Sequence, residues 1–185
     1  MPMDQGKQVL MQEEEIQRTI SRMAHEIVEK NGGTESLALI GIRSKGAHLV
    51  RRIAKKIESL NGAAVPVGII DVRPYRDDVE KAGGIAGPPP VEAPGSVDDK
   101  TVVLVDDVIY RGRTIRAALD LVGHLGKPRR VLVATLVDRG ARELPIKADI
   151  IGKNIRVADS ERVNVLLQES DGVDQVTVTA YGQRK

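Results

Sequence analysis

The chain has 185 residues, which fits one domain of ordinary size with a sizeable core. It contains 28 Lys and Arg against 26 Asp and Glu, a net charge of +2, so a nucleic-acid partner would have to bind a local basic patch. The chain has no cysteine, which excludes disulfides and thiolate metal sites, and 2% aromatic residues, which excludes folds that stack bases on aromatic rings.

The N-terminal third of the chain predicts a helix, a strand and a second helix. Residues 13–30 form an amphipathic pattern with acidic residues at its start, and Asn31-Gly32-Gly33 ends it. The run LALIGI, residues 37–42, is typical of a strand buried on both faces. A second helical pattern follows and stops at Asn61-Gly62. The apolar positions of the two helices are Ile16, Ile20, Met23 and Ile27, and Leu49, Ile53, Ile57 and Leu60.

Further apolar runs predict strands over residues 65–72, 101–105 and 131–137, with a helix over about 114–125. Shorter runs at 148–152, 163–167 and 175–181 predict edge strands. Because strands alternate with helices, we expect a single α/β domain with a largely parallel sheet.

The segment 83–95, GGIAGPPPVEAPG, interrupts this alternation. Its glycines and prolines exclude a helix or a central strand. A long irregular stretch inside a domain is either a functional lid or an inert linker, and no second domain is apparent for it to link. We therefore favour a lid or flexible arm.

Targeting and metal-binding signals are absent from the sequence. The start, MPMDQGKQVLMQEEE, lacks the basic-then-apolar order of a signal peptide, and no apolar run reaches the roughly 18–20 residues of a bilayer span. His25, His48 and His124 are scattered along the chain. We expect a soluble cytoplasmic protein with no membrane partner.

The stretch TVVLVDDVIYRGRTIRAAL, residues 101–119, carries the clearest chemistry. Asp106 and Asp107 come directly after a buried strand, where parallel α/β sheets bind ligands. The turn 110–114 then supplies backbone N–H groups and a hydroxyl at a helix start, which suits an anion. A phosphate on the turn and a ribose over the carboxylates would use both features. Alternatively, the acids only cap a turn and Thr114 only caps the helix.

This stretch resembles the phosphoribosyl-pyrophosphate (PRPP) signature of type I phosphoribosyltransferases, in which an apolar strand, two acids and three residues precede Thr-Gly-x-Thr. Segments 21–31, 41–46, 71–78, 136–155 and 160–163 resemble the pyrimidine operon attenuation regulators, a family that doubles as a uracil phosphoribosyltransferase. The resemblance runs from about residue 10 to about 175. It implies a mostly parallel central sheet flanked by helices, a small hood and a flexible Gly/Pro-rich loop over about 76–99, opened by Tyr75-Arg76-Asp77-Asp78.

The implied reaction is uracil plus PRPP giving UMP and pyrophosphate, with Mg²⁺ carried by PRPP. The implied regulation is attenuation of pyrimidine biosynthesis genes, in which bound UMP or UTP favours binding to the leader messenger RNA. The family also implies a homodimer or a larger homo-oligomer.

The resemblance implies a role for each site residue. Asp106, Asp107 and Arg139 are the implied catalytic residues, the two acids holding the ribose hydroxyls. The implied substrate-binding residues also include Val108, Ile109, Tyr110, Arg111, Gly112, Arg113 and Thr114, and the turn 110–114 is the implied 5′-phosphate loop. The implied pyrophosphate loop comprises Arg43, Ser44, Lys45 and Gly46, whose positive charge would offset the developing negative charge. Without the resemblance, these basic residues would be interpreted as ordinary surface charge.

The hood over uracil is implied to include Val137, Asp138, Arg139 and Val163. Arg18, Arg22 and His25 lie opposite the apolar face of the first helix and form a basic stripe, which would otherwise be interpreted as a solvated face. The implied RNA contacts are Arg18, Ser21, Arg22, His25, Arg142, Lys147 and Lys153.

Two residues depart from the family pattern. Arg111 replaces the first threonine of the signature, which predicts weakened but present PRPP and UMP binding, and Ala141 replaces a histidine. Two alternatives stay open: a salvage phosphoribosyltransferase for uracil or a purine base without RNA regulation, and an RNA-binding regulator that lost catalysis through Arg111.

Overall fold

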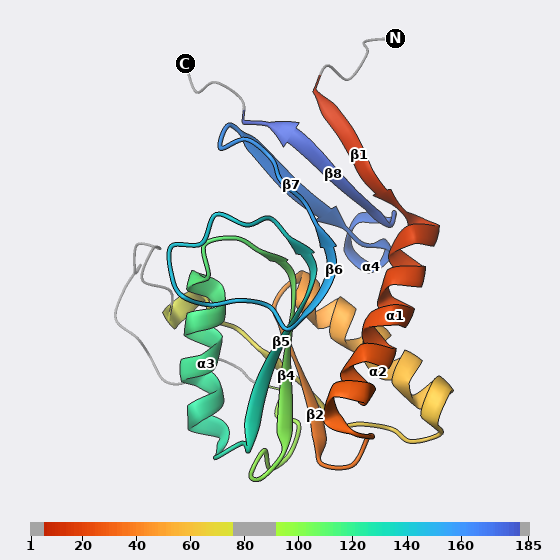
Figure 1. Ribbon diagram of the computed structural model, residues 1–185, viewed down its shortest axis with the longest axis vertical. Helices are drawn as coiled ribbons and strands as arrows, with labels where there is room; N and C mark the ends of the chain where they lie inside the picture. The colour runs from red at the N-terminus through yellow and green to blue at the C-terminus, as the bar shows by residue number, and fades with distance from the viewer. Residues whose placement is uncertain (1–5, 76–91, 182–185) are drawn as a thin grey trace.

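The computed structural model describes residues 6–75 and 92–181, and its centre is a five-stranded parallel sheet (Figure 1). The strand order is β3-β2-β4-β5-β6. The strands are β2 (Leu37–Ile42), β3 (Val67–Ile70), β4 (Thr101–Ile109), β5 (Arg130–Asp138) and β6 (Ile150–Asn154). Every residue of β2 is buried, as its continuous apolar run predicts.

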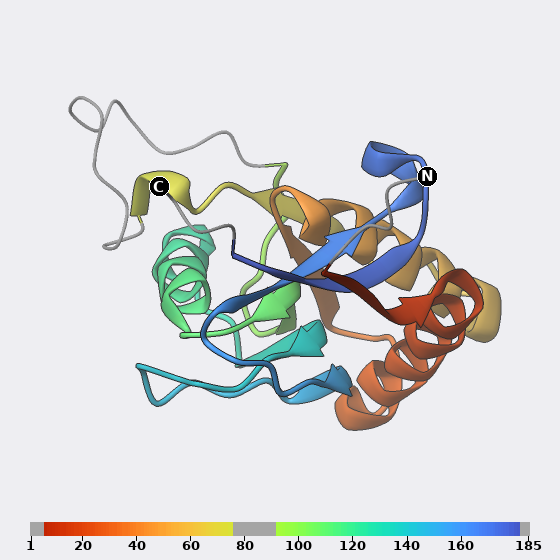
Figure 2. The ribbon, with the colours of Figure 1, turned by 90° about the horizontal axis from the view of Figure 1, so that it is seen from above.

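Helices cover both faces of this sheet. Figure 2 shows α1 (Glu13–Asn31) and α2 (Lys45–Asn61) on one side and α3 (Arg113–Leu125) on the other. Leu37 and Leu39 of β2 pack in the core beneath α1 and α2, whereas Ala38 and Ile40 pack in the core beneath α3. The alternating side chains of one strand therefore supply both layers.

A second, three-stranded antiparallel sheet forms the hood at the top of Figure 1. It consists of β1 (Lys7–Gln12), β8 (Gln175–Ala180) and β7 (Glu161–Leu166), in that order. The short helix α4 (Gln168–Asp171) joins β7 to β8. The prediction that residues 175–181 form an edge strand is wrong, because β8 lies between β1 and β7.

The other predicted strands except 37–42 also have different bounds in the structure, and two of them bear on the site. The strand predicted over 101–105 continues to Ile109, because it keeps pairing with β5 through Asp106 opposite Thr135 and Val108 opposite Val137. Asp106 and Asp107 therefore lie within the last part of β4 and not after it. The strand predicted over 65–72 is only Val67–Ile70.

Part of the predicted flexible loop 76–99 can be described. Glu92 and Ile69 exchange backbone hydrogen bonds of 3.0 and 2.8 Å, and Val97 is fully buried. Residues 92–99 are thus attached to the domain beside β3. The remainder of that prediction, residues 76–91, lies outside the described residues, as do Arg76, Asp77 and Asp78.

Within residues 6–75 and 92–181, none of the helices combines the length and the apolar character that a membrane span requires.

Candidate active site

A pocket of about 320 Å³ opens at the carboxyl ends of β4 and β5, beneath the hood. Residues from β4, the loop after it, the start of α3, the end of β5 and β7 line the pocket. They are Asp106, Val108, Ile109, Tyr110, Arg111, Gly112, Arg113, Thr114, Ile115, Arg139, Arg162, Val163 and Tyr181. Most of the residues assigned to the 5′-phosphate and the uracil hood therefore share one cavity.

The expected 5′-phosphate loop leads directly into α3. Gly112 has a φ of 95°, a left-handed conformation that favours glycine, and it precedes the first helical residue, Arg113. The first backbone bond of the helix runs from the N–H of Arg116 to the carbonyl of Gly112, at 3.0 Å. The N–H groups of the turn before it have no helical acceptors, and they stand at the positive end of the helix dipole. This arrangement suits a phosphate group.

Residues after β5 support the phosphate loop from outside. The carbonyl of Arg111 accepts hydrogen bonds from the N–H groups of Glu143 and Leu144, at 3.0 and 3.3 Å. A Cβ on Gly112 would lie 3.5 Å from the Cβ atoms of Leu144 and Ile146. The loop is therefore held by packing as well as by backbone hydrogen bonds.

Arg111 places its guanidinium at the rim of the pocket. Its side chain is 51% exposed, and its Nε lies 3.2 Å from Oε1 of Glu143, whose other oxygen accepts a hydrogen bond from Arg113 at 2.9 Å. The guanidinium carbons of Arg111 and Arg139 lie 5.0 and 3.9 Å from the centre of the Tyr110 ring. A hydrogen bond with the Tyr110 side chain, and then the Glu143 charge, raise the pKa of Arg111 further.

The two acids of the signature lie at different depths. Asp106 is buried and lines the pocket, and its Oδ1 accepts a hydrogen bond from the N–H of Asp107 at 2.9 Å. Asp107 is half-buried and does not line the pocket, and its carbonyl accepts a hydrogen bond from the Thr135 hydroxyl at 3.2 Å. Asp106 is therefore the acid that the pocket presents.

The expected pyrophosphate loop, residues 43–46, lies directly beside these acids. A Cβ on Gly46 would come within 2.5 Å of the Val105 carbonyl oxygen and 3.3 Å of the Asp106 Cα, so only glycine allows this approach. The pocket at β4 does not include these loop residues, and Arg43 and Ser44 line a separate hollow beside β3. The loop and the pocket are thus neighbours that meet at Asp106.

The Arg43 guanidinium faces a carboxylate that the sequence did not single out. Asp71 is buried, and Arg73 donates to it from Nε at 2.9 and 3.0 Å while Arg43 lies 3.9 Å away. Hydrogen bonding from Arg73, followed in smaller part by the Arg43 charge, lowers the pKa of Asp71. Asp71 would anchor the pyrophosphate loop at its N-terminal side.

Of the residues expected to form the hood over uracil, only Val163 lies in the three-stranded hood sheet, because Val137 and Asp138 belong to β5 of the central sheet and Arg139 follows it. Arg139 is only 7% exposed and lines the pocket with Val163, whereas Val137 is fully buried and does not line it. The Asp138 carboxylate accepts hydrogen bonds from the N–H of Gly140 at 2.8 Å and from Arg142 at 2.7 Å. It therefore closes the turn after β5.

Three pocket-lining residues were missed by the sequence reasoning: Arg162, Tyr181 and Ile115. Arg162 stands next to Val163 in the segment SERV, and Tyr181 is one of only three tyrosines. These two features could have indicated a role at the site. Only the pairing of β7 with β8, however, brings Arg162 and Tyr181 to the same wall of the pocket.

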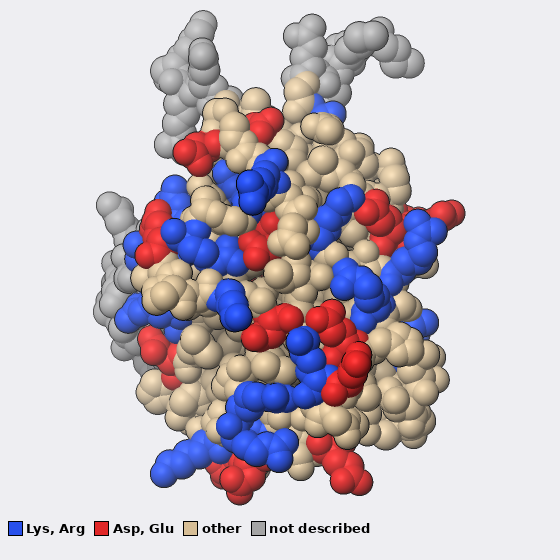
Figure 3. Space-filling model, in the orientation of Figure 1, with Lys and Arg blue, Asp and Glu red and all other residues tan. Residues whose placement is uncertain are grey.

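The expected RNA contacts differ in their exposure and in their hydrogen-bond partners. Arg18, Arg22 and His25 are exposed on α1, and Arg22 donates to the carbonyls of Ile151 and Gly152, at 3.1 and 2.5 Å, on the neighbouring strand β6. On β6, the Lys153 Nζ donates a hydrogen bond to Oε1 of Glu15 on α1, at 2.7 Å. Ser21 is half-buried on α1, and Lys147 is exposed before β6. Figure 3 shows that Lys and Arg alternate with Asp and Glu over the face that carries α1.

Arg142 has a different environment from the other expected RNA contacts. Its guanidinium donates to the carbonyls of Ile146, Tyr110 and Gly140, at 2.8, 2.9 and 3.3 Å, and to Asp138. The side chain is 20% exposed. Arg142 thus joins the turn after β5 to the loop 110–114.

The comparisons with known proteins agree with this geometry. The family model of the phosphoribosyl transferase domain matches residues 8–167, so the chain belongs to the phosphoribosyl transferase family. Solved structures similar to it include the hypoxanthine phosphoribosyltransferase of Trypanosoma cruzi in complex with IMP, with a TM-score of 0.74, 16% identity and 100% of both chains covered. A Staphylococcus aureus hypoxanthine phosphoribosyltransferase has a TM-score of 0.70, 21% identity and coverage of 95% and 92%. These likenesses confirm the predicted type I fold.

Curated relatives narrow the family further. The chain is 49% identical over 176 residues to the bifunctional protein PyrR of Chloroflexus aurantiacus, covering 95% of this chain and 96% of the relative. It is 50% identical over 170 residues to the bifunctional protein PyrR of Thermus thermophilus, covering 92% and 94%. The chain therefore belongs with the bifunctional PyrR proteins, which confirms the resemblance inferred from the sequence.

Proposed function

We propose that the protein converts uracil and PRPP to UMP and pyrophosphate, and that it also binds the leader messenger RNA of pyrimidine biosynthesis genes when a uridine nucleotide occupies the site. One observation carries this proposal: the loop 110–114, the buried Asp106 and the loop 43–46 lie together, in a chain about half identical to bifunctional PyrR proteins over nearly its whole length.

The reaction needs three anchored groups around one carbon atom. The bond from ribose C1′ to pyrophosphate breaks with its electron pair on pyrophosphate, while N1 of uracil bonds to C1′ and loses its proton. The loop 110–114 would hold the 5′-phosphate, and Asp106 with Asp107 would hold the ribose hydroxyls. The loop 43–46 would stabilise the departing pyrophosphate, so catalysis would rest on positioning and electrostatic stabilisation.

Magnesium would enter with PRPP and not as a resident ion. Within the described part of the chain, no group of three His, Asp or Glu side chains could hold a metal. The Asp106 and Asp107 carboxylates are hard oxygen donors that suit Mg²⁺ shared with substrate oxygens. When bound, the ion would neutralise charge on the pyrophosphate.

Catalysis is proposed to survive the replacement at Arg111. Its side chain is half-exposed and pairs with Glu143, and two hydrogen bonds hold its backbone carbonyl. The phosphate would lose a threonine hydroxyl but keep the N–H groups at the start of α3. This geometry favours an active enzyme over a regulator that lost catalysis through Arg111.

The RNA surface is proposed to be the exposed side of α1 with the neighbouring β6. Arg18, Arg22 and His25 lie there, next to Lys153. Since acidic residues alternate with basic ones on this face, a single copy of the chain provides only a weak positive electrostatic potential for RNA (Figure 3). A homodimer would double the number of cations available to the RNA, and a larger homo-oligomer would raise it further.

A uracil phosphoribosyltransferase assay tests the enzymatic part directly. Purified protein is given PRPP, Mg²⁺ and either uracil or hypoxanthine, and product formation is followed chromatographically. We expect UMP from uracil. Product from hypoxanthine alone would support the alternative of a purine salvage enzyme, and no product from either base would support the purely regulatory alternative.

A further inference from the structure

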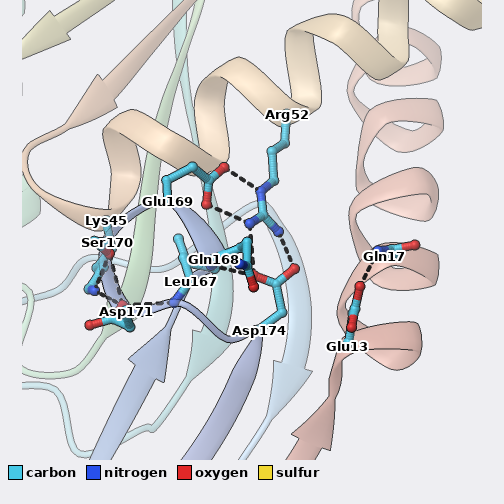
Figure 4. A network of polar contacts seen from close by, with 10 residues as sticks. All are labelled: Glu13, Gln17, Lys45, Arg52, Leu167, Gln168, Glu169, Ser170, Asp171 and Asp174. Atoms are coloured by element: carbon cyan, nitrogen blue, oxygen red, sulfur yellow. Dashed lines mark hydrogen bonds and ion pairs between the residues drawn. The ribbon is translucent and has the colours of Figure 1, made fainter.

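The hood is tied to α2 by a cluster of charged side chains around α4 (Figure 4). Arg52 of α2 donates to both oxygens of Glu169, at 2.8 and 2.5 Å, and to both oxygens of Asp174, at 2.8 and 2.7 Å. Asp174 is buried and also accepts a hydrogen bond from the N–H of Gln168 at 2.7 Å. This half of the cluster fixes α4 on the side of α2.

The other half of the cluster holds Lys45, a residue of the proposed pyrophosphate loop. The Lys45 ammonium donates to the Ser170 hydroxyl at 2.6 Å and forms an ion pair with Asp171. Asp171 is itself fixed by hydrogen bonds from the N–H of Leu167 and from the Ser170 hydroxyl, both at 2.8 Å. The side chains of Lys45 and Asp171 are only 20% and 26% exposed, so water screens this pair incompletely.

The two cations of the loop thus have different surroundings. Arg43 is 55% exposed and shares the single Asp71 carboxylate with Arg73, so two positive charges face one negative charge there. Lys45 has a carboxylate of its own. The positive charge that Lys45 could offer to pyrophosphate is largely neutralised by a residue of the hood.

We propose that Asp171 determines how the site discriminates between PRPP and UMP, by holding the Lys45 ammonium away from the pyrophosphate. This inference rests on the proposed function. PRPP carries a pyrophosphate that must compete with Asp171 for Lys45, whereas UMP carries none. Asp171 therefore weakens the binding of PRPP without weakening that of UMP.

The position of α4 supports this reading. It follows β7 directly, and β7 carries Arg162 and Val163 in the wall of the nucleotide pocket. The same strand thus contacts the nucleotide side of the site and leads into the acid that holds Lys45 on the pyrophosphate side. A free-standing surface ion pair would have no such connection.

The test compares Asp171→Asn with Glu169→Gln. Both variants remove one negative charge from α4, but only the first releases Lys45, because Glu169 binds Arg52. We expect Asp171→Asn to lower the KM for PRPP and the dissociation constant of magnesium pyrophosphate about fivefold. A change of this factor corresponds to the interaction free energy of a partly exposed ion pair. The UMP dissociation constant, measured by calorimetry, should stay within twofold. Glu169→Gln should leave all three quantities within twofold.

The proposal is wrong if Asp171→Asn leaves the KM for PRPP unchanged or raises it, or if Glu169→Gln lowers it equally. In a chain that already carries Lys45→Met, adding Asp171→Asn should change pyrophosphate binding no further. Ser170→Ala, which keeps the carboxylate, is the second variant if Asp171→Asn fails to fold, and it should lower the same constants by a smaller factor. A wild-type protein that makes no UMP would reject the proposed function, whereas pyrophosphate calorimetry would still decide on Asp171.

Discussion

Replacing Arg142 should damage the nucleotide site and not only an RNA contact. In the structure its guanidinium holds three carbonyls and the Asp138 carboxylate, which is 13% exposed. Arg142→Ala leaves that carboxylate without its cation and the Tyr110 carbonyl without this donor. Because water can reach part of the gap, we expect a loss of about 3 kcal/mol in the free energy of unfolding. For a chain of this size that corresponds to a fall of roughly 6–12 °C in Tm.

Arg142→Lys separates a structural role from an RNA contact. Lysine keeps the positive charge that an RNA phosphate would bind, but one ammonium cannot reproduce the planar set of four hydrogen bonds. We expect both variants to weaken UMP binding at least about tenfold, since each loosens the phosphate loop at Tyr110. Calorimetry with UMP and thermal unfolding measure the two effects. If Arg142→Ala left Tm and UMP affinity unchanged and only RNA binding fell, the structural role that we assign to Arg142 would be refuted.

Three further predictions follow from the site, the ion pairs and the surface. Asp106→Asn should lower kcat/KM for UMP formation by about 100-fold, because a buried charge beside the reacting ribose is lost; a loss below tenfold in the uracil assay would contradict that role. The Lys45 hydrogen bond lowers the pKa of Asp171 from 3.8 to about 2, so the stability it contributes is complete above about pH 4 and is lost as the pH falls toward 2. The free energy of unfolding, measured with urea between pH 6 and 3, should therefore fall less steeply with decreasing pH for Asp171→Asn than for the wild type. Equal slopes for the two proteins would show that Asp171 contributes no such stability. Arg18→Ala should reduce the slope of log RNA affinity against log salt by about 1, and an unchanged slope would mean that Arg18 contacts no phosphate.

The central sheet could be predicted from the sequence because its strands are buried on both faces. The run 37–42 is continuous in apolar residues, and the structure gives the same bounds for β2. By contrast, β1 was not predicted: of KQVLMQ only Met11 is buried, and the strand exists because it pairs with β8 near the other end of the chain. Pairing between distant segments leaves little trace in a local pattern.

The candidate site was predicted where a motif is local and missed where residues meet only in space. Asp106 and the phosphate loop lie within ten residues of each other, so the signature identifies both. The contact between Lys45 and Asp171 joins residues 126 positions apart, and nothing near either residue indicates it. The same holds for Arg142, because its implied role as an RNA contact gave no sign of its bonds to Tyr110 and Asp138.

The most direct test of a combined enzyme and regulator is a titration of the pyrimidine leader RNA with and without UMP, on a preparation that makes UMP from uracil and PRPP. We expect UMP to tighten RNA binding, and linkage then requires RNA to tighten UMP binding by the same factor. Equal RNA affinities in the two titrations, on an active preparation, would contradict the regulatory function and leave a salvage enzyme.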